Sequence, residues 1–108
     1  MKLREMAHAR AGDKGSIVNI SLIAFDVADY PLLAEHVTAE KVSALFAPIL
    51  ARPVERYTIP GLGALNFVLH RTPAETVTRS LHLDAHGKGL SYVLLNMEVD
   101  IEGDRRIG

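Results

Sequence analysis

The sequence has no cysteine, no large excess of either charge and no long apolar run. Without cysteine there is no disulfide framework, no thiolate nucleophile and no thiolate metal site. A formal net charge of −1 gives no electrostatic reason to expect nucleic-acid binding, because nucleic-acid-binding proteins usually carry a basic face. No segment approaches the run of about 20 apolar residues that spans a bilayer, and residues 1–5 contain no signal-peptide core. We therefore expect a cytoplasmic protein that binds neither nucleic acid nor membrane.

What is present is the composition of a small globular domain. The chain has 108 residues, of which 48% are hydrophobic and 23% charged. That length supports one hydrophobic core and is too short for two. We expect a single domain over residues 1–102, followed by a flexible tail over residues 103–108.

Residues 9–16 form the most informative stretch, with two glycines, one acidic residue and two basic residues between apolar segments. Glycine lets a ligand or another chain approach the backbone closely. Arg10 and Lys14 place positive charge there, and backbone N–H groups in such a turn can bind an anion. The stretch therefore predicts a loop that forms a binding edge, without indicating a reaction.

The first half of the chain predicts two strands and a helical region. Residues 2–8 read as a short first strand, and residues 17–25 as a central strand buried on both faces. Asn19 then needs hydrogen-bond partners, and it either ties down the neighbouring loop or contacts a ligand. Asp29 is a candidate cap for a helical turn, and Thr38 for a longer helix that kinks or ends at Pro48. The apolar face of that helix is Val42, Leu45, Phe46, Ile49 and Leu50.

The second half predicts an antiparallel hairpin, formed by residues 53–59 and 64–70 around a turn at residues 60–63. Residues 80–84 read as a short strand, a helix starts at Lys88, and residues 98–101 alternate like an edge strand. Together the elements fit an α+β fold: a ferredoxin-like βαββαβ sandwich, with an antiparallel sheet and helices packed on one face.

Several short motifs also resemble one known family. Residues 9–15 read ARAGDKG and are followed by Asn19 and Ile20, which is similar to the ARSGDKG…NIG signature of the AtuA-like domain. Residues 60–67 read PGLGALNF, as that family does, and residues 33–42, 80–84 and 87–88 match in the same order. The resemblance covers most of the chain and implies the same ferredoxin-like fold. Ala11 departs from the family's serine, and residues 75–77 depart from its glycines.

The resemblance also implies a role. In that family the domain occurs as the C-terminal part of a longer protein, or as a separate short chain encoded beside the large one. This chain resembles the short form. Leu62 and Phe67 within PGLGALNF read equally well as core residues or as interface anchors.

No familiar catalytic or cofactor motif is present. Residues 12–15 are not a P-loop, residues 61–63 lack the rest of a dinucleotide motif, and no G-x-S-x-G elbow occurs. His82, Asp84 and His86 lie close in sequence but lack a recognised metal-ligand spacing. We therefore expect neither a metal nor a cofactor, and no residue is identified as catalytic.

The candidate residues for binding an anion or a partner come from the glycine-rich loops and the matching motifs. Taken alone, Asp13 is an ordinary turn residue and Lys88 an ordinary exposed lysine, so the motif match is what singles them out. The full candidate set is Arg10, Gly12, Asp13, Lys14, Gly15, Asn19, Gly61, Gly63, Asn66, Asp84 and Lys88.

Three hypotheses about function follow. In the first, the chain is the small companion subunit of a two-component AtuA-like system in carboxylic-acid or acyl-CoA catabolism, docked on a larger catalytic chain. In the second, it is a stand-alone homo-oligomer that binds or transforms small anions such as carboxylates or acyl-CoA, using Arg10, Lys14 and Lys88. In the third, it is a purely structural dimerisation module, and replacing the two lysines by alanine leaves activity intact.

Overall fold

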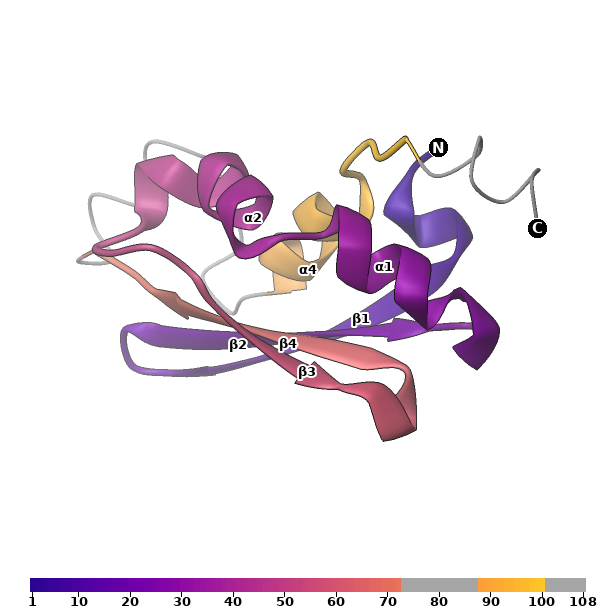
Figure 1. Cartoon of the computed structure of the whole chain (residues 1–108). Coiled ribbons are helices and arrows are strands. Elements are labelled where there is room, and N and C mark those ends of the chain that lie inside the picture. The colour runs from indigo at the N-terminus through magenta and orange to yellow at the C-terminus, as the bar shows by residue number, and fades with distance from the viewer. Residues whose placement is uncertain (73–87, 101–108) are drawn as a thin grey trace.

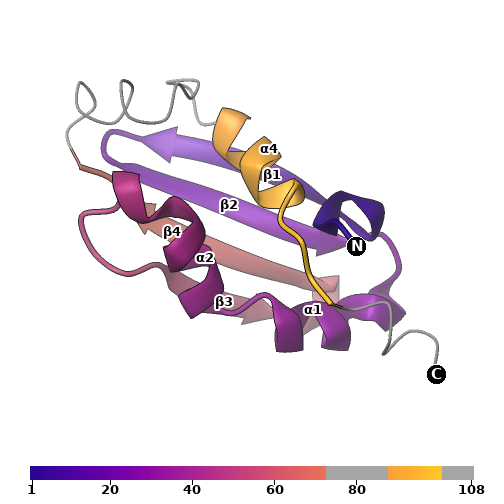
Figure 2. The same cartoon turned by 90° about the horizontal axis from the view of Figure 1, so that it is seen from above.

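A computed structural model of the chain describes residues 1–72 and 88–100. It shows a four-stranded antiparallel sheet with the strand order β1-β2-β4-β3. Three α-helices, α1, α2 and α4, lie together over one face of this sheet (Figures 1 and 2). Among the described residues, none of the helices covers the opposite face, which we call the open face. The predicted α+β, ferredoxin-like sandwich is confirmed.

The N-terminal hairpin differs from its prediction. Residues Leu3–Glu5 form a short 3-10 turn, and β1 runs over Ala7–Lys14, through most of the predicted loop. It pairs along its whole length with β2, Ile17–Ala24, so that the turn between them is only Gly15 and Ser16. Gly15 has φ of 65°, a left-handed angle that glycine adopts without steric cost. The glycine-rich stretch is therefore mostly strand, with a tight turn at its end.

Strand β2 is buried on one face only, which corrects the prediction of burial on both. Val18, Ile20 and Leu22 are fully buried beneath the helices, whereas Asn19 on the opposite face is exposed. Side chains of a strand point alternately to its two faces, and the helices cover just one of them. The predicted need of a buried Asn19 for hydrogen-bond partners therefore does not arise.

The region between β2 and β3 is helical. A 3-10 turn at Val27–Asp29 leads into α1, Tyr30–His36, and then α2, Ala39–Phe46. The hydroxyl of Thr38 accepts a hydrogen bond from Lys41 N at 3.1 Å, which confirms the predicted cap of α2. Asp26 rather than Asp29 makes the other cap, accepting from Ala28 N at 2.9 Å. As predicted, the α-helix stops before Pro48, and Ala47–Ile49 continues as a 3-10 turn.

The predicted second hairpin is confirmed. Strand β3, Glu55–Ile59, pairs antiparallel with β4, Ala64–His70, and Pro60–Leu62 forms a 3-10 turn between them. On the helix side of β3, Arg56 donates through Nη1 to the carbonyl oxygens of Ala34 at 2.7 Å and Val37 at 3.0 Å. This side chain ties the end of α1 to the sheet.

The last described helix, α4, spans Lys88–Leu95 and packs against β1, which confirms the predicted helix. Beyond it, residues 98–100 do not join the four-stranded sheet. Glu98 forms an isolated bridge with Lys2, and Val99 N donates to Met1 O at 2.9 Å. The edge beside β2 is taken by β1 instead of the predicted C-terminal strand. The predictions for residues 80–84 and 103–108 lie outside the described residues.

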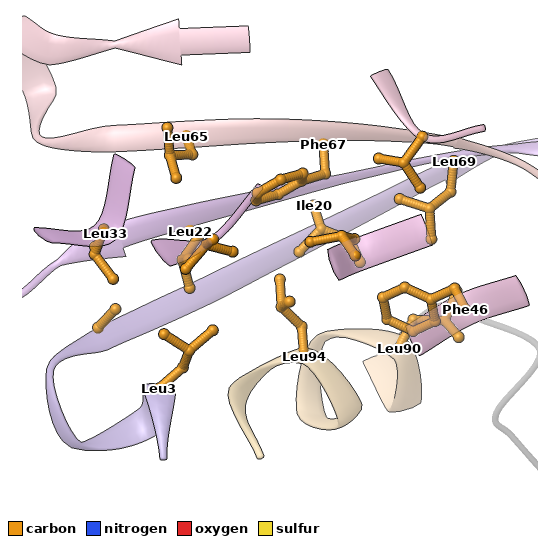
Figure 3. Packing of buried hydrophobic residues seen from close by; sticks show 14 of the residues in the cluster. Leu3, Ile20, Leu22, Leu33, Phe46, Leu65, Phe67, Leu69, Leu90 and Leu94 are labelled. Carbon is orange, nitrogen blue, oxygen red and sulfur yellow. The ribbon is translucent and has the colours of Figure 1, made fainter. Parts of the chain in front are cut away.

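One hydrophobic core lies between the sheet and the helices (Figure 3). Phe67 of β4 is fully buried there, so of its two predicted roles it has the core role, whereas Leu62 is 70% exposed. The helices contribute Leu33, Phe46, Leu90 and Leu94 to the same cluster. The core therefore sits wholly on the helix side of the sheet and leaves the open face to face outward.

Candidate functional site

The open face is built from alternate residues of all four strands. Strand pairing sets these residues in cross-strand rows, because each side chain lies beside its partner on the neighbouring strand. From β1 to β3 the rows are His8, Ile23, Ala64 and Ile59; then Arg10, Ser21, Asn66 and Tyr57; then Gly12, Asn19, Val68 and Glu55; with Lys14, Ile17 and His70 at the far end.

Positive charge gathers on one edge of this face. His8, Arg10 and Lys14 alternate along β1 and are all exposed. The intervening residue on the same side is Gly12, and the acidic Asp13 points to the helix side. Because β1 is an edge strand, this basic row is open to an approaching acidic group.

A hollow of about 360 Å³ lies at the end of the open face nearest the β3–β4 turn. Its walls combine an apolar part, from β2, β3, β4 and the 3-10 turn, with a polar part from β1 and β2. The lining residues are His8, Arg10, Ser21, Ile23, Ile59, Leu62 and Ala64. Asn66 Nδ2 donates a hydrogen bond to Ser21 Oγ at 3.0 Å and so holds that hydroxyl in place.

Large apolar side chains surround the hollow and are exposed. The ring of Phe25 stacks on His8, with 5.7 Å between ring centroids and 17° between planes. Tyr57 is 52% exposed, Ile59 38% and Phe25 63%, and Leu62 stands beside them. Exposed apolar side chains are ordinary when scattered singly, but a contiguous group of them marks a surface that binds something.

A chain of hydrogen bonds crosses the other half of the open face. Glu55 accepts from Tyr57 Oη at 2.7 Å and from His70 Nε2 at 3.0 Å. Arg52 Nη2 donates to His70 Nδ1 at 3.3 Å, and arginine has no acceptor, so this imidazole carries its proton on Nε2. The hydrogen bonds from Tyr57 and His70 lower the pKa of Glu55, and the hydrogen bond to Glu55 raises the pKa of Tyr57.

The turn at the other end of β1 is held by β4. Arg71 N donates to Ser16 O at 2.7 Å, and Arg71 Nη2 donates to Gly15 O at 3.2 Å. The backbone carbonyls of this turn are therefore engaged, and the turn is tied to its neighbour.

The structure brings some of the sequence-derived candidates together and separates others. Arg10, Gly12, Lys14, Asn19 and Asn66 share the open face. Gly15 lies in the turn at one end of the sheet, and Gly61 and Gly63 lie in the turn at the other end. Asp13 points to the helix side, Lys88 begins α4 on that same side, and Asp84 lies outside the described residues. Lys14 and Lys88 therefore do not form one site.

Sequence reasoning missed His8, Ser21, Ile59, Ala64 and Tyr57 as parts of one surface. The signal that would have found them is the period-two alternation, continued through residues 9–14 instead of being interrupted there by a loop. Within residues 1–72 and 88–100, no group of three side chains is placed to hold a metal ion. None of the described helices is long and apolar enough to cross a membrane.

Fold and surface together define an α+β sandwich whose candidate site is the uncovered face of its sheet rather than an enclosed cavity. The chain belongs to the AtuA ferredoxin-like domain family, whose model matches residues 1–100 of the 108. The family membership predicted from the sequence motifs is thereby confirmed. A comparison with curated proteins and a comparison with solved structures each gave no match.

Proposed function

We propose that this chain is the small companion subunit of a two-component AtuA-like system, and that its open face docks on a larger catalytic chain acting in carboxylic-acid or acyl-CoA catabolism. The observation that carries the proposal is the group of exposed apolar side chains on that face, Phe25, Tyr57, Ile59 and Leu62. Aromatic and aliphatic side chains of this kind form the cores of protein interfaces, where they lose their contact with water.

The charges on the open face indicate what the partner surface contains. Glu55 is already hydrogen-bonded within the chain, whereas the basic row of His8, Arg10 and Lys14 faces outward. Complementary charge speeds association and selects the correct partner. We therefore expect the larger chain to present acidic side chains to β1 and an apolar patch to the β3–β4 end of the face.

The test is co-expression with the large AtuA-like chain encoded beside this one, followed by affinity purification and a measurement of the dissociation constant. Tyr57→Ser removes an aromatic ring from the open face and should weaken the complex by about tenfold or more, as at interface hot spots. Tyr92→Ser is the matched control, because Tyr92 is 64% exposed but lies on α4, on the other side of the sheet. The control should leave the affinity unchanged.

Two outcomes would contradict the proposal. One is equal loss of affinity in both tyrosine variants, which would mean that the open face is not the docking surface. The other is an isolated chain that forms a stable oligomer through Tyr57 and does not bind the large chain. That result would favour the stand-alone homo-oligomer.

A further inference from the structure

The hollow on the open face has a clear physical origin. Ala64 on β4 lies between Ile23 on β2 and Ile59 on β3 in one cross-strand row. A methyl group between two larger side chains leaves a depression, and Leu62 from the adjoining 3-10 turn adds a further wall. The result is an apolar pit that is open to water, with Ala64 itself only 3% exposed at its floor.

The other end of the hollow presents hydrogen-bond donors. Ser21 Oγ already accepts from Asn66 Nδ2, so its own O–H is available to donate to a second group. Arg10 has five N–H donors, no acceptor, and no ion-pair or hydrogen-bond partner among the described residues. Two available donors, one of them charged, fit a ligand that offers anionic oxygens.

We propose that this hollow binds a short aliphatic carboxylate. The carboxylate would lie between Arg10 and Ser21, and the alkyl chain over Ala64 against Ile23, Ile59 and Leu62. Adjacent rows on one face of a strand are about 7 Å apart, a distance that an alkyl chain of roughly five carbons spans. The inference goes beyond the docking role and does not depend on it, because every lining residue belongs to this chain.

The apolar half of the hollow separates this ligand from other anions. Inorganic phosphate would satisfy Arg10 and Ser21 but would leave the pit unfilled, and an alcohol would fill the pit but leave the guanidinium unpaired. A chain docked on the open face would also exclude water from the hollow and strengthen the ion pair.

The experiment is a titration of the isolated, isotope-labelled chain with pentanoate, followed by NMR. The expected result is saturable binding, with shifts concentrated at the amides of Arg10, Ser21 and Ala64. Arg10→Gln should weaken the affinity by about tenfold or more, since it removes a charged hydrogen bond. Lys41→Gln removes the same charge from an exposed position on α2 and should change the affinity by less than about twofold. 1-Pentanol and inorganic phosphate should each bind more weakly than pentanoate.

Each other outcome overturns the inference. Absence of saturable shifts would mean that the hollow accepts no free carboxylate and serves only as a contact for a partner side chain. Equal weakening in Arg10→Gln and Lys41→Gln would mean a general effect of charge. Phosphate binding as tight as pentanoate binding would mean that the apolar walls contribute nothing. Because the large chain is absent from this titration, failure here leaves the docking proposal to be judged by its own experiment.

Discussion

At the scale of single residues, Gly63 meets two requirements at once. Its φ of 62° lies in the left-handed region, and its N–H donates to Pro60 O at 3.0 Å, closing the turn between β3 and β4. Its carbonyl accepts from Ala24 N at 2.9 Å, which joins this turn to the end of β2. A Cβ atom added here would come within 3.1 Å of Val27 Cγ2. Both the backbone angle and the space therefore require glycine.

Replacing Gly63 by alanine should lower the free energy of unfolding by about 1–3 kcal/mol, because a non-glycine residue in this conformation is strained and Val27 must also move. Gly12→Ala is the control. Gly12 lies in β1 with nothing within 4 Å of an added Cβ, so alanine should be neutral there or stabilise by up to about 1 kcal/mol. Urea denaturation of the two variants measures the difference, and an equal effect at both positions would refute this account.

Residue-level predictions succeeded where the interaction is local in sequence. Thr38 could be identified as a helix cap because its hydroxyl bonds a backbone N–H three residues away. Asp29 was chosen over Asp26 because the proline nearby suggested where the helix starts, while the intervening 3-10 turn left no sequence signal. The exposure of Asn19 could not be predicted, because it depends on which face the distant helices cover.

At the scale of elements, the β3–β4 hairpin carries the titratable part of the open face. Glu55 on β3 joins Tyr57, two residues along, to His70 on β4. The ionised carboxylate is the form that accepts both hydrogen bonds, which is why its pKa is lowered in the folded chain. The hairpin should therefore be stabilised in a window of pH set by these groups.

A lowered carboxyl pKa stabilises the folded chain above the usual value of 4.5, and this contribution is lost as pH falls through the folded pKa. A raised phenol pKa stabilises below the usual value of 10.0, and its contribution is lost as pH rises through the raised value. Glu55→Gln should therefore be less stable than the unmodified chain near neutral pH, and the difference should shrink on acidification below pH 4.5. Urea denaturation over a pH series measures this, and a difference that is constant with pH would contradict it.

The element most misjudged from sequence is β1. Gly12, Asp13 and Gly15 are typical of loops, and local preference alone favours a loop there. Pairing with β2 overrides that preference, because each residue of Ala7–Lys14 has a partner on the neighbouring strand. The consequence for the site is direct. Arg10 and Lys14 are placed on one face of a strand instead of in a mobile anion-binding loop, and the hollow depends on a register across four strands.

At the scale of the whole molecule, one core joins the two ends of the described chain. Leu3 near the N-terminus and Leu94 in α4 are both fully buried in the cluster that also contains Ile20 of β2 (Figure 3). Residues far apart in sequence thus depend on the same packing. The chain should unfold as one cooperative unit, as small single domains usually do.

Leu94→Ala should lower the free energy of unfolding by about 2–5 kcal/mol, the usual cost of a large-to-small change in a core, while unfolding remains a single transition. Tyr92→Ser, two residues away on the exposed side of α4, should change the stability by less than about 0.5 kcal/mol. Circular dichroism and hydrogen exchange measure both variants. Loss of α4 alone, with the sheet still protected, would show that the helix is not part of the cooperative unit.

The alternating basic side chains on β1 also bear on how copies of this protein behave at high concentration. An outermost strand offers unpaired backbone groups to which a second copy can add, the first step toward fibres. Were two copies to join there, His8, Arg10 and Lys14 of each would crowd against the same residues of the other, and like charges side by side repel. The row that invites an acidic visitor thus discourages the molecule from polymerising with itself.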